Sequence, residues 1–188
     1  MTNEIKIYVA NLGKYNEGES VGEWFTLPVD LEEIRVAIGV AHYDEDENFI
    51  PYVEENDVTY EEWAIYDYEA PFSISEYASI EKLNEIAELI EGKEGYEIEA
   101  ISELFQGNYV SDFEEGCNAI DNGDVQFYHD CKDMSDIAYK FYEETGKLEE
   151  LTKHINESYI DFEAIGRDME IEGHFIELSN GVWVEYRN

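Results

Sequence analysis

The first third of the chain alternates apolar and polar residues in short runs, with the period of two that is typical of β-strands. Asp30, with Glu33 three residues later, predicts a capping box at the start of a short helix that Gly39 ends. The Gly- and Asn-rich stretch 11–22 is interpreted as a loop, and the acidic, aperiodic stretch 42–60 is interpreted as a loop or an insertion. These elements predict a small α+β domain over residues 1–69, with strands over residues 5–9, 24–27 and 63–66.

After Pro71 the apolar residues recur with the helical period of three to four. One helix is predicted up to Gly92, the residue type that commonly follows a helix C-terminus. Its apolar face consists of Ile80, Leu83, Ile86, Ala87 and Ile90. A second short helix over residues 98–105 is closed by Gly107. The pattern therefore predicts a central helical domain over residues 70–107.

The last third of the chain mixes both periods and is predicted as a C-terminal α+β domain over residues 108–188. A capping box over residues 111–114 opens one helix, and Asp133 opens another that Gly146 ends. Residues 155–165 are weakly helical. Strands are predicted over residues 125–129, 175–178 and 182–186, and Asn180-Gly181 between the last two is a hairpin signal. The predicted fold class is α+β, an elongated chain of three small domains.

The charge of the chain changes this picture of an ordinary small protein. Of its 188 residues, 47 are Asp or Glu and only 11 are Lys or Arg, which gives a formal net charge of −36 at pH 7. An acidic disordered segment is poor in aromatic residues, whereas this chain is 14% aromatic and 44% hydrophobic and should fold. A folded anionic surface repels itself, so we expect a function that requires it.

The acidic residues are concentrated where basic residues are missing. Residues 36–81 contain thirteen acids and residues 94–131 contain ten, and neither window has a Lys or Arg. Local i,i+4 pairs cannot neutralise these windows. Their carboxylates are therefore expected to face solvent, a metal or a basic partner.

The same charge argues against several functions. Without a basic patch, direct binding of nucleic acid is not expected, and an anionic membrane surface should repel the chain. No apolar run is long enough to span a membrane, and the start of the chain does not have the pattern of a signal peptide. We therefore expect a cytoplasmic protein.

No catalytic or metal-binding constellation is evident. The four histidines are spread singly, and the closest metal-ligand grouping, Cys117, His129 and Cys131, does not have zinc-finger spacing. The stretch from Asp44 begins like a calcium loop, but Phe49 stands where the sharp turn requires Gly. The chain is predicted to be no enzyme and to use no cofactor and no metal.

Aromatic residues in the N-terminal part form a second feature of interest. They could form a surface on which a ligand stacks, although half-buried strand residues are the simpler interpretation. The residues are Tyr8, Tyr15, Trp24, Trp63, Tyr66 and Tyr68.

The net charge can be compared with that of DNA. Duplex DNA carries two charges per base pair, so the charge of this chain corresponds to roughly 18 base pairs, and a homodimer would present roughly twice that. Such a protein would compete with DNA for the basic groove of a DNA-binding protein, with fast and salt-dependent association.

Several stretches resemble the ArdA antirestriction proteins, and they cover nearly all of the chain. The stretch Ile7-Tyr8-Val9-Ala10-Asn11-Leu12-Gly13 is similar to the family's N-terminus. Asp133-Met134-Ser135-Asp136-Ile137-Ala138-Tyr139 is similar to its antirestriction motif region. Further similar stretches are residues 14–19, 22–28, 65–69, 143–146, 159–162 and 166–168.

The resemblance implies a DNA mimic, encoded on a mobile genetic element, that inhibits type I restriction–modification enzymes by occupying the DNA-binding groove of their methyltransferase core. It also implies a curved molecule of three small domains that forms a homodimer. The segments 44–57 and 107–124 look longer than is usual for the family. The expected dimer contact comprises Asp133, Met134, Asp136, Ile137, Ala138, Phe141 and Tyr142.

Carboxylates are expected to stand in for phosphates at the target-binding surface. Two alternatives stay open from the residues alone: an acidic mimic directed at another DNA-binding protein, and an acidic salt-adapted protein that binds metal. The candidate phosphate mimics are Glu32, Glu33, Asp44, Asp46, Glu54, Glu55, Glu61, Glu62, Glu114 and Glu115.

Overall fold

The computed structural model describes residues 4–179 and 181–187, and the chain divides into two compact units, Met1–Ile98 and Glu99–Asn188. Each unit combines helices with small antiparallel sheets, so the predicted α+β class is confirmed. The division into three domains stays a prediction. Among the described residues, no helix has the length and apolar character needed to cross a membrane.

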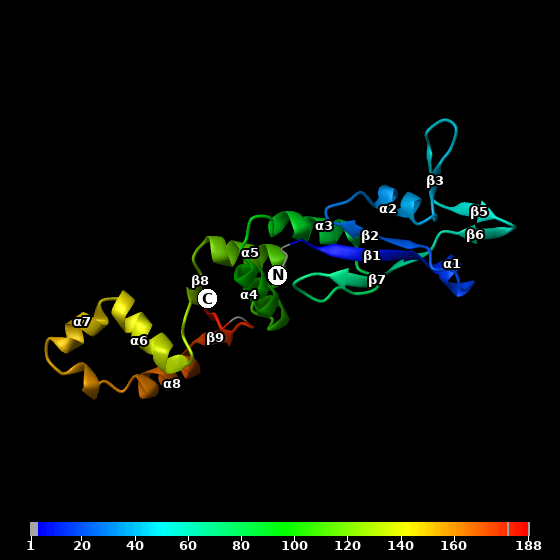
Figure 1. Ribbon diagram of the computed structural model, residues 1–188. Helices are drawn as coiled ribbons and strands as arrows, with labels where there is room; N and C mark the ends of the chain where they lie inside the picture. The colour runs from blue at the N-terminus through cyan, green and yellow to red at the C-terminus, as the bar shows by residue number, and fades with distance from the viewer. Residues whose placement is uncertain (1–3, 180, 188) are drawn as a thin grey trace. The chain divides into compact units, whose positions relative to one another are not determined.

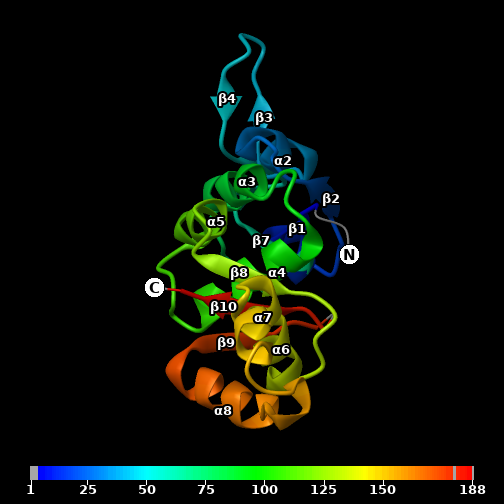
Figure 2. The same ribbon diagram turned by 90° about the vertical axis from the view of Figure 1, so that its left-hand side faces the viewer.

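The N-terminal unit is built on a three-stranded antiparallel sheet in the order β2 (Gly22–Thr26), β1 (Lys6–Asn11) and β7 (Trp63–Glu69). All three strands were predicted. Ile7 and Val9 of the central strand are buried, whereas Lys6 and Tyr8 are partly exposed, as the alternation requires. Figures 1 and 2 show helices α2 (Leu31–Ala37) and α3 (Ile80–Leu89) on the same side of this sheet.

The two helices begin and end close to the predicted residues. Asp30 caps α2, although its carboxylate accepts a hydrogen bond from the N–H of Glu32 (2.7 Å) and not of Glu33. Ser79 caps α3 in the same way through the N–H of Lys82. Gly39 follows the end of α2 with a φ of 71°, a conformation that glycine adopts without a steric penalty.

The predicted loop over residues 11–22 is wrong in its first part, where helix α1 (Leu12–Asn16) forms. The side chain of Asn11 accepts a hydrogen bond from the N–H of Lys14 (3.0 Å) and so caps the helix. Asn is a favoured residue at this position. One turn of helix contains too few apolar residues to show a helical period, which is why the pattern did not reveal it.

The predicted loop over residues 42–60 is also wrong, because the chain forms two short hairpins there. Strand β3 (His42–Tyr43) pairs with β4 (Phe49–Ile50), and β5 (Val53–Glu55) pairs with β6 (Val58–Tyr60). Strands of two or three residues cannot display a period. A turn signal was present, however: Asn56 and Asp57 have φ values of 53° and 65°, as in the type I′ turn that favours these residue types.

The C-terminal unit contains a second three-stranded antiparallel sheet, in the order β8 (Val125–Tyr128), β10 (Trp183–Tyr186) and β9 (His174–Glu177). The predicted hairpin is confirmed by the pairing of β9 with β10, and Asn180 of its turn signal lies outside the described residues. The helices are α4 (Gly95–Gln106), whose first residues belong to the N-terminal unit, α5 (Phe113–Asp121), α6 (Met134–Glu144), α7 (Lys147–Thr152), α8 (Phe162–Glu172) and the 3-10 turn η1 (Glu157–Tyr159).

Two sequence predictions for this unit need correction, and one helix was missed. The capping box of α5 lies one residue later than expected: Asp112 accepts from the N–H of Glu115, and Glu115 accepts from the N–H of Ser111. Helix α7 was not predicted. Helix α8 begins inside the weakly helical stretch 155–165 and continues well beyond it, since its apolar residues are spaced among many charged ones.

Helices α6 and α8 pack against each other at Gly166. A Cβ atom at this residue would lie only 2.5 Å from the carbonyl oxygen of Met134 and 2.6 Å from its carbonyl carbon. Both neighbours are backbone atoms, which cannot rotate away. The close approach of the two helices therefore requires glycine at position 166.

We expect Gly166→Ala to lower the free energy of unfolding by about 1–3 kcal/mol, the usual cost of overpacking a core. This cost should exceed the gain of up to about 1 kcal/mol that alanine offers in a helix. Denaturant unfolding followed by circular dichroism measures the change. The control is Glu170→Ala on the exposed face of α8, which should stay within about 0.5 kcal/mol of the wild type. Equal stability of the Gly166 variant and the control would contradict this account.

Candidate target-binding site

The ten candidate phosphate mimics lie in five short segments. Eight belong to the N-terminal unit, between Glu32 and Glu62, and two belong to the C-terminal unit. All are exposed except Asp44, which is half-buried. They are distributed as follows: Glu32 and Glu33 in the first turn of α2, Asp44 and Asp46 between β3 and β4, Glu54 and Glu55 on β5, Glu61 and Glu62 between β6 and β7, and Glu114 and Glu115 in the first turn of α5.

Four of the ten carboxylates have partners inside the protein. Glu32 accepts a hydrogen bond from the hydroxyl of Tyr43 (3.1 Å), and Glu55 pairs with Lys14. Asp44 accepts from the N–H groups of Asn48 and Asp46, which closes the β3–β4 turn and lowers the pKa of Asp44. The N–H of Ser111 likewise lowers the pKa of Glu115. These four carboxylates have a structural role.

The other six carboxylates make no side-chain hydrogen bond or ion pair with any residue that the structure describes. Exposed carboxylates without an internal partner can accept hydrogen bonds from the cationic side chains of another protein. They are therefore the part of the predicted set that is available for a target. The six are Glu33, Asp46, Glu54, Glu61, Glu62 and Glu114.

A basic residue on α2 anchors the β3–β4 hairpin. The guanidinium group of Arg35 donates a hydrogen bond of 2.6 Å to the carbonyl oxygen of Pro51 and lies 5.5 Å from the centre of the Phe49 ring. The hydroxyl of Tyr43 reaches Glu32 on the same helix. The position of this acidic hairpin is thus set from α2.

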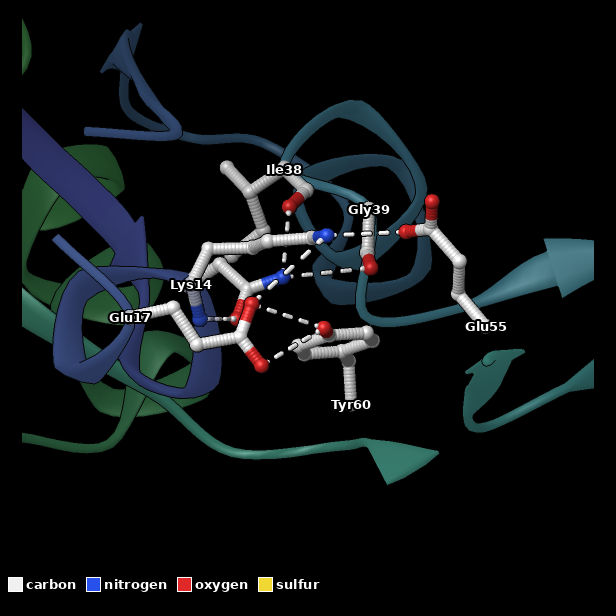
Figure 3. Close-up of polar contacts among 7 residues, drawn as sticks. Lys14, Glu17, Ile38, Gly39, Glu55 and Tyr60 are labelled. Atoms are coloured by element: carbon white, nitrogen blue, oxygen red, sulfur yellow. Dashed lines mark hydrogen bonds and ion pairs between the residues drawn. The ribbon is translucent and has the colours of Figure 1, made fainter. Parts of the chain in front are cut away.

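A basic residue on α1 anchors the β5–β6 hairpin (Figure 3). The ammonium group of Lys14 lies 2.8 Å from a carboxylate oxygen of Glu55, 3.9 Å from Glu17 and 4.4 Å from the centre of the Tyr60 ring. Tyr60 is buried and donates its hydroxyl hydrogen to Glu17 at 2.9 Å. The hydrogen bond with Glu55 raises the pKa of Lys14, so the ammonium group stays charged.

Asn11 ties this network to the rest of the unit. Its side chain is 1% exposed and donates to the carbonyl oxygens of Ile38 (3.3 Å) and Gly39 (3.2 Å), just after α2. Because the same side chain caps α1, one buried amide joins the start of α1 to the end of α2. A buried polar group of this kind is stable only when its hydrogen bonds are made.

Sequence reasoning did not identify Asn11, Lys14, Arg35 or Tyr60 as important for the site. One signal was available. The window 36–81 has no Lys or Arg, so a cationic side chain that binds its carboxylates has to come from another part of the chain. Lys14 and Arg35 are the two such residues that precede the window most closely. Which carboxylate each of them would contact could not be inferred.

The expected dimer residues have mixed surroundings. Met134, Ile137 and Ala138 are 8%, 0% and 0% exposed within a single chain, so they belong to the core of the C-terminal unit. Asp133 caps α6 and Asp136 accepts from the N–H of Lys132. Phe141 and Tyr142 are half-buried beneath the ammonium group of Lys147. The dimer contact stays a prediction.

Two cysteines and the stretch from Asp44 were considered for metal binding. Cys117 and Cys131 are buried thiols, and burial raises the pKa of Cys131. Within residues 4–179 and 181–187, no three His, Cys, Asp or Glu side chains are grouped so that they could hold a metal ion.

We expect Lys14→Met to release the β5–β6 hairpin while leaving the sheet intact, because the variant loses the ion pair with Glu55 and the contact with the Tyr60 ring. Heteronuclear NOE values measured by NMR should fall for residues 53–60 and remain unchanged for β1. Lys82→Met on α3 removes the same charge and serves as the control. Unchanged values in the Lys14 variant would show that this cation does not hold the hairpin.

Comparison with known proteins places the whole chain in one family. The chain has no match among curated proteins. The profile of the family described as antirestriction protein (ArdA) matches residues 7–184, which cover most of both compact units and all ten candidate carboxylates. Members of this family are inhibitors, not enzymes, and they mimic DNA to inhibit type I restriction enzymes. The chain therefore belongs to the ArdA family of antirestriction proteins.

Proposed function

We propose that the exposed carboxylates of this protein replace DNA phosphates in the DNA-binding groove of a type I restriction–modification enzyme, at its methyltransferase core. The observation that supports this proposal is the set of exposed carboxylates without an internal partner, which lie on helix ends, on the two anchored hairpins and between β6 and β7. A surface of fixed negative charges competes with DNA because the groove is built to attract a polyanion.

The proposal depends on the anchoring of the hairpins as much as on the charge. A flexible acidic segment would lose conformational entropy when it binds, whereas a preorganised segment loses less. Lys14 and Arg35 each hold one hairpin in place. Two basic residues therefore fix the positions of carboxylates on a surface whose overall charge is strongly negative.

We also propose that the protein acts in the cytoplasm, where restriction enzymes meet incoming DNA, and that it works as a homodimer through the region 133–142. Among the seven expected dimer residues, the exposed Asp133 and Asp136 and the half-buried Phe141 and Tyr142 are the side chains that a second copy can reach. A homodimer would present about twice the charge of one chain, comparable with a long stretch of duplex DNA.

Titration of the protein into a type I methyltransferase core bound to labelled duplex DNA should displace the DNA near stoichiometry. Because the binding is electrostatic, displacement should weaken as the salt concentration rises. Fluorescence anisotropy of the DNA at 50 mM and 200 mM salt would measure both effects. Absence of displacement at both concentrations would refute the proposal for that enzyme.

Mimicry by many carboxylates predicts that no single one dominates. Each of the six unpartnered carboxylates, changed to its amide, should raise the Kd by less than about fivefold, since an exposed ion pair contributes about 0.2–1 kcal/mol. All six changes together should raise it by about tenfold or more. Circular dichroism confirms that the variants fold. A single amide substitution that abolishes inhibition in a folded protein would argue against distributed mimicry.

A further inference from the structure

Three exposed tyrosines from separate segments of the N-terminal unit gather at one place. Tyr15 lies on α1, Tyr66 on β7, and Tyr77 in the segment between β7 and α3. The ring centres of Tyr15 and Tyr66 are 4.9 Å apart at an angle of 48°. The N–H of Ile65 donates to the carbonyl oxygen of Glu76 (2.9 Å), which holds the residue next to Tyr77 against the strand that carries Tyr66.

These rings do not belong to the core. Tyr15, Tyr66 and Tyr77 are 54%, 39% and 70% exposed, so most of their combined surface remains in contact with water. A single exposed tyrosine needs no explanation, but a group of exposed aromatic rings on rigid elements is typical of an interaction site. Tyrosine is also enriched among the residues that contribute most to protein–protein binding.

The surroundings of the three tyrosines are acidic. The carboxylates of Glu76 and Glu62 lie close enough to the Tyr77 hydroxyl to raise its pKa, with Glu76 as the larger cause. The basic residue next to Tyr15 in sequence, Lys14, is held by Glu55 and Glu17. The rings and their neighbours therefore form an aromatic surface with a negative rim.

This combination selects the chemistry of a ligand. An anion is repelled, whereas a cation is attracted both by the ring faces and by the carboxylates. Arginine fits better than lysine, because its planar guanidinium group can stack on an aromatic face and at the same time donate two hydrogen bonds to a carboxylate.

We propose that Tyr15, Tyr66 and Tyr77, with Glu62 and Glu76 at their rim, form a docking surface for arginine side chains of the target enzyme's DNA-binding groove. The identity of the target rests on the proposed function, whereas the preference for arginine rests on the surface itself. Stacked arginine is less exposed to salt than an ion pair in water. The surface thus adds a contribution to binding that depends little on salt, beside that of the carboxylates.

The preference for arginine can be tested without the target. Hexa-arginine and hexa-lysine peptides, added separately to the full-length protein, carry the same charge. We expect hexa-arginine to shift the ring signals of the three tyrosines in NMR spectra at lower concentration than hexa-lysine. The ring of Tyr52, which is exposed but contacts no other ring in the described structure, should respond equally to both peptides. Equal responses of the three tyrosines to the two peptides would overturn the proposal.

The contribution to inhibition requires the target. In the DNA competition assay, the double variant Tyr15→Leu and Tyr77→Leu should bind at least fivefold more weakly, with an unchanged salt dependence, because leucine keeps an apolar side chain but has no ring. Tyr77→Phe, which keeps the ring, should bind like the wild type, and Tyr52→Leu is the matched control. Sedimentation measures the oligomeric state of each variant.

The outcomes of the assay separate the two proposals. If the wild type displaces DNA and the double variant does so equally well, the docking surface is refuted and DNA mimicry stands. If the wild type displaces no DNA, the proposed function fails, and the peptide titration still decides the preference for arginine. A changed oligomeric state in the double variant would assign the surface to contact between copies of this chain and overturn the proposal.

Discussion

The structure depends on a few basic side chains that hold acidic segments in place although the carboxylates of the surface repel one another. With 47 carboxylates against 11 Lys and Arg residues, most acidic side chains cannot be paired. The two acidic hairpins between residues 42 and 60 have no basic residue of their own. Lys14 holds one of them through Glu55, and Arg35 holds the other through the carbonyl oxygen of Pro51. The protein thus uses cations from the preceding helices to set the positions of negative charges.

The carboxylates themselves serve two purposes. Some, such as Asp44 and Glu115, accept hydrogen bonds from backbone N–H groups and so close a turn or cap a helix. Others, such as Glu33 and Glu54, face solvent without a partner among the described residues. An acidic composition is therefore compatible with a stable fold, because part of the negative charge satisfies backbone donors that would otherwise be unpaired. The remainder is available to a cationic partner.

Prediction from the sequence succeeded where an element was long enough to repeat its pattern. Strand β1 buries Ile7 and Val9, helix α3 buries Ile80 and Leu83, both pairs at the spacing of their element, and both elements were found. Helix α1 and the hairpin strands of two or three residues were missed, because a period cannot be recognised in so few positions. Their formation depends on contacts with distant residues, such as the packing of the Tyr60 ring against Gly13.

The sequence by itself determined the sign and amount of charge, the α+β class and the family, because these follow from composition, local periodicity and the match of residues 7–184 to the family profile. Only the tertiary structure decided which carboxylates lack partners, that Met134 and Ile137 lie in the core, and that Tyr15, Tyr66 and Tyr77 gather on one surface. The reason is physical: Lys14 and Glu55 are 41 residues apart. Whether two such residues meet depends on how the elements between them pack.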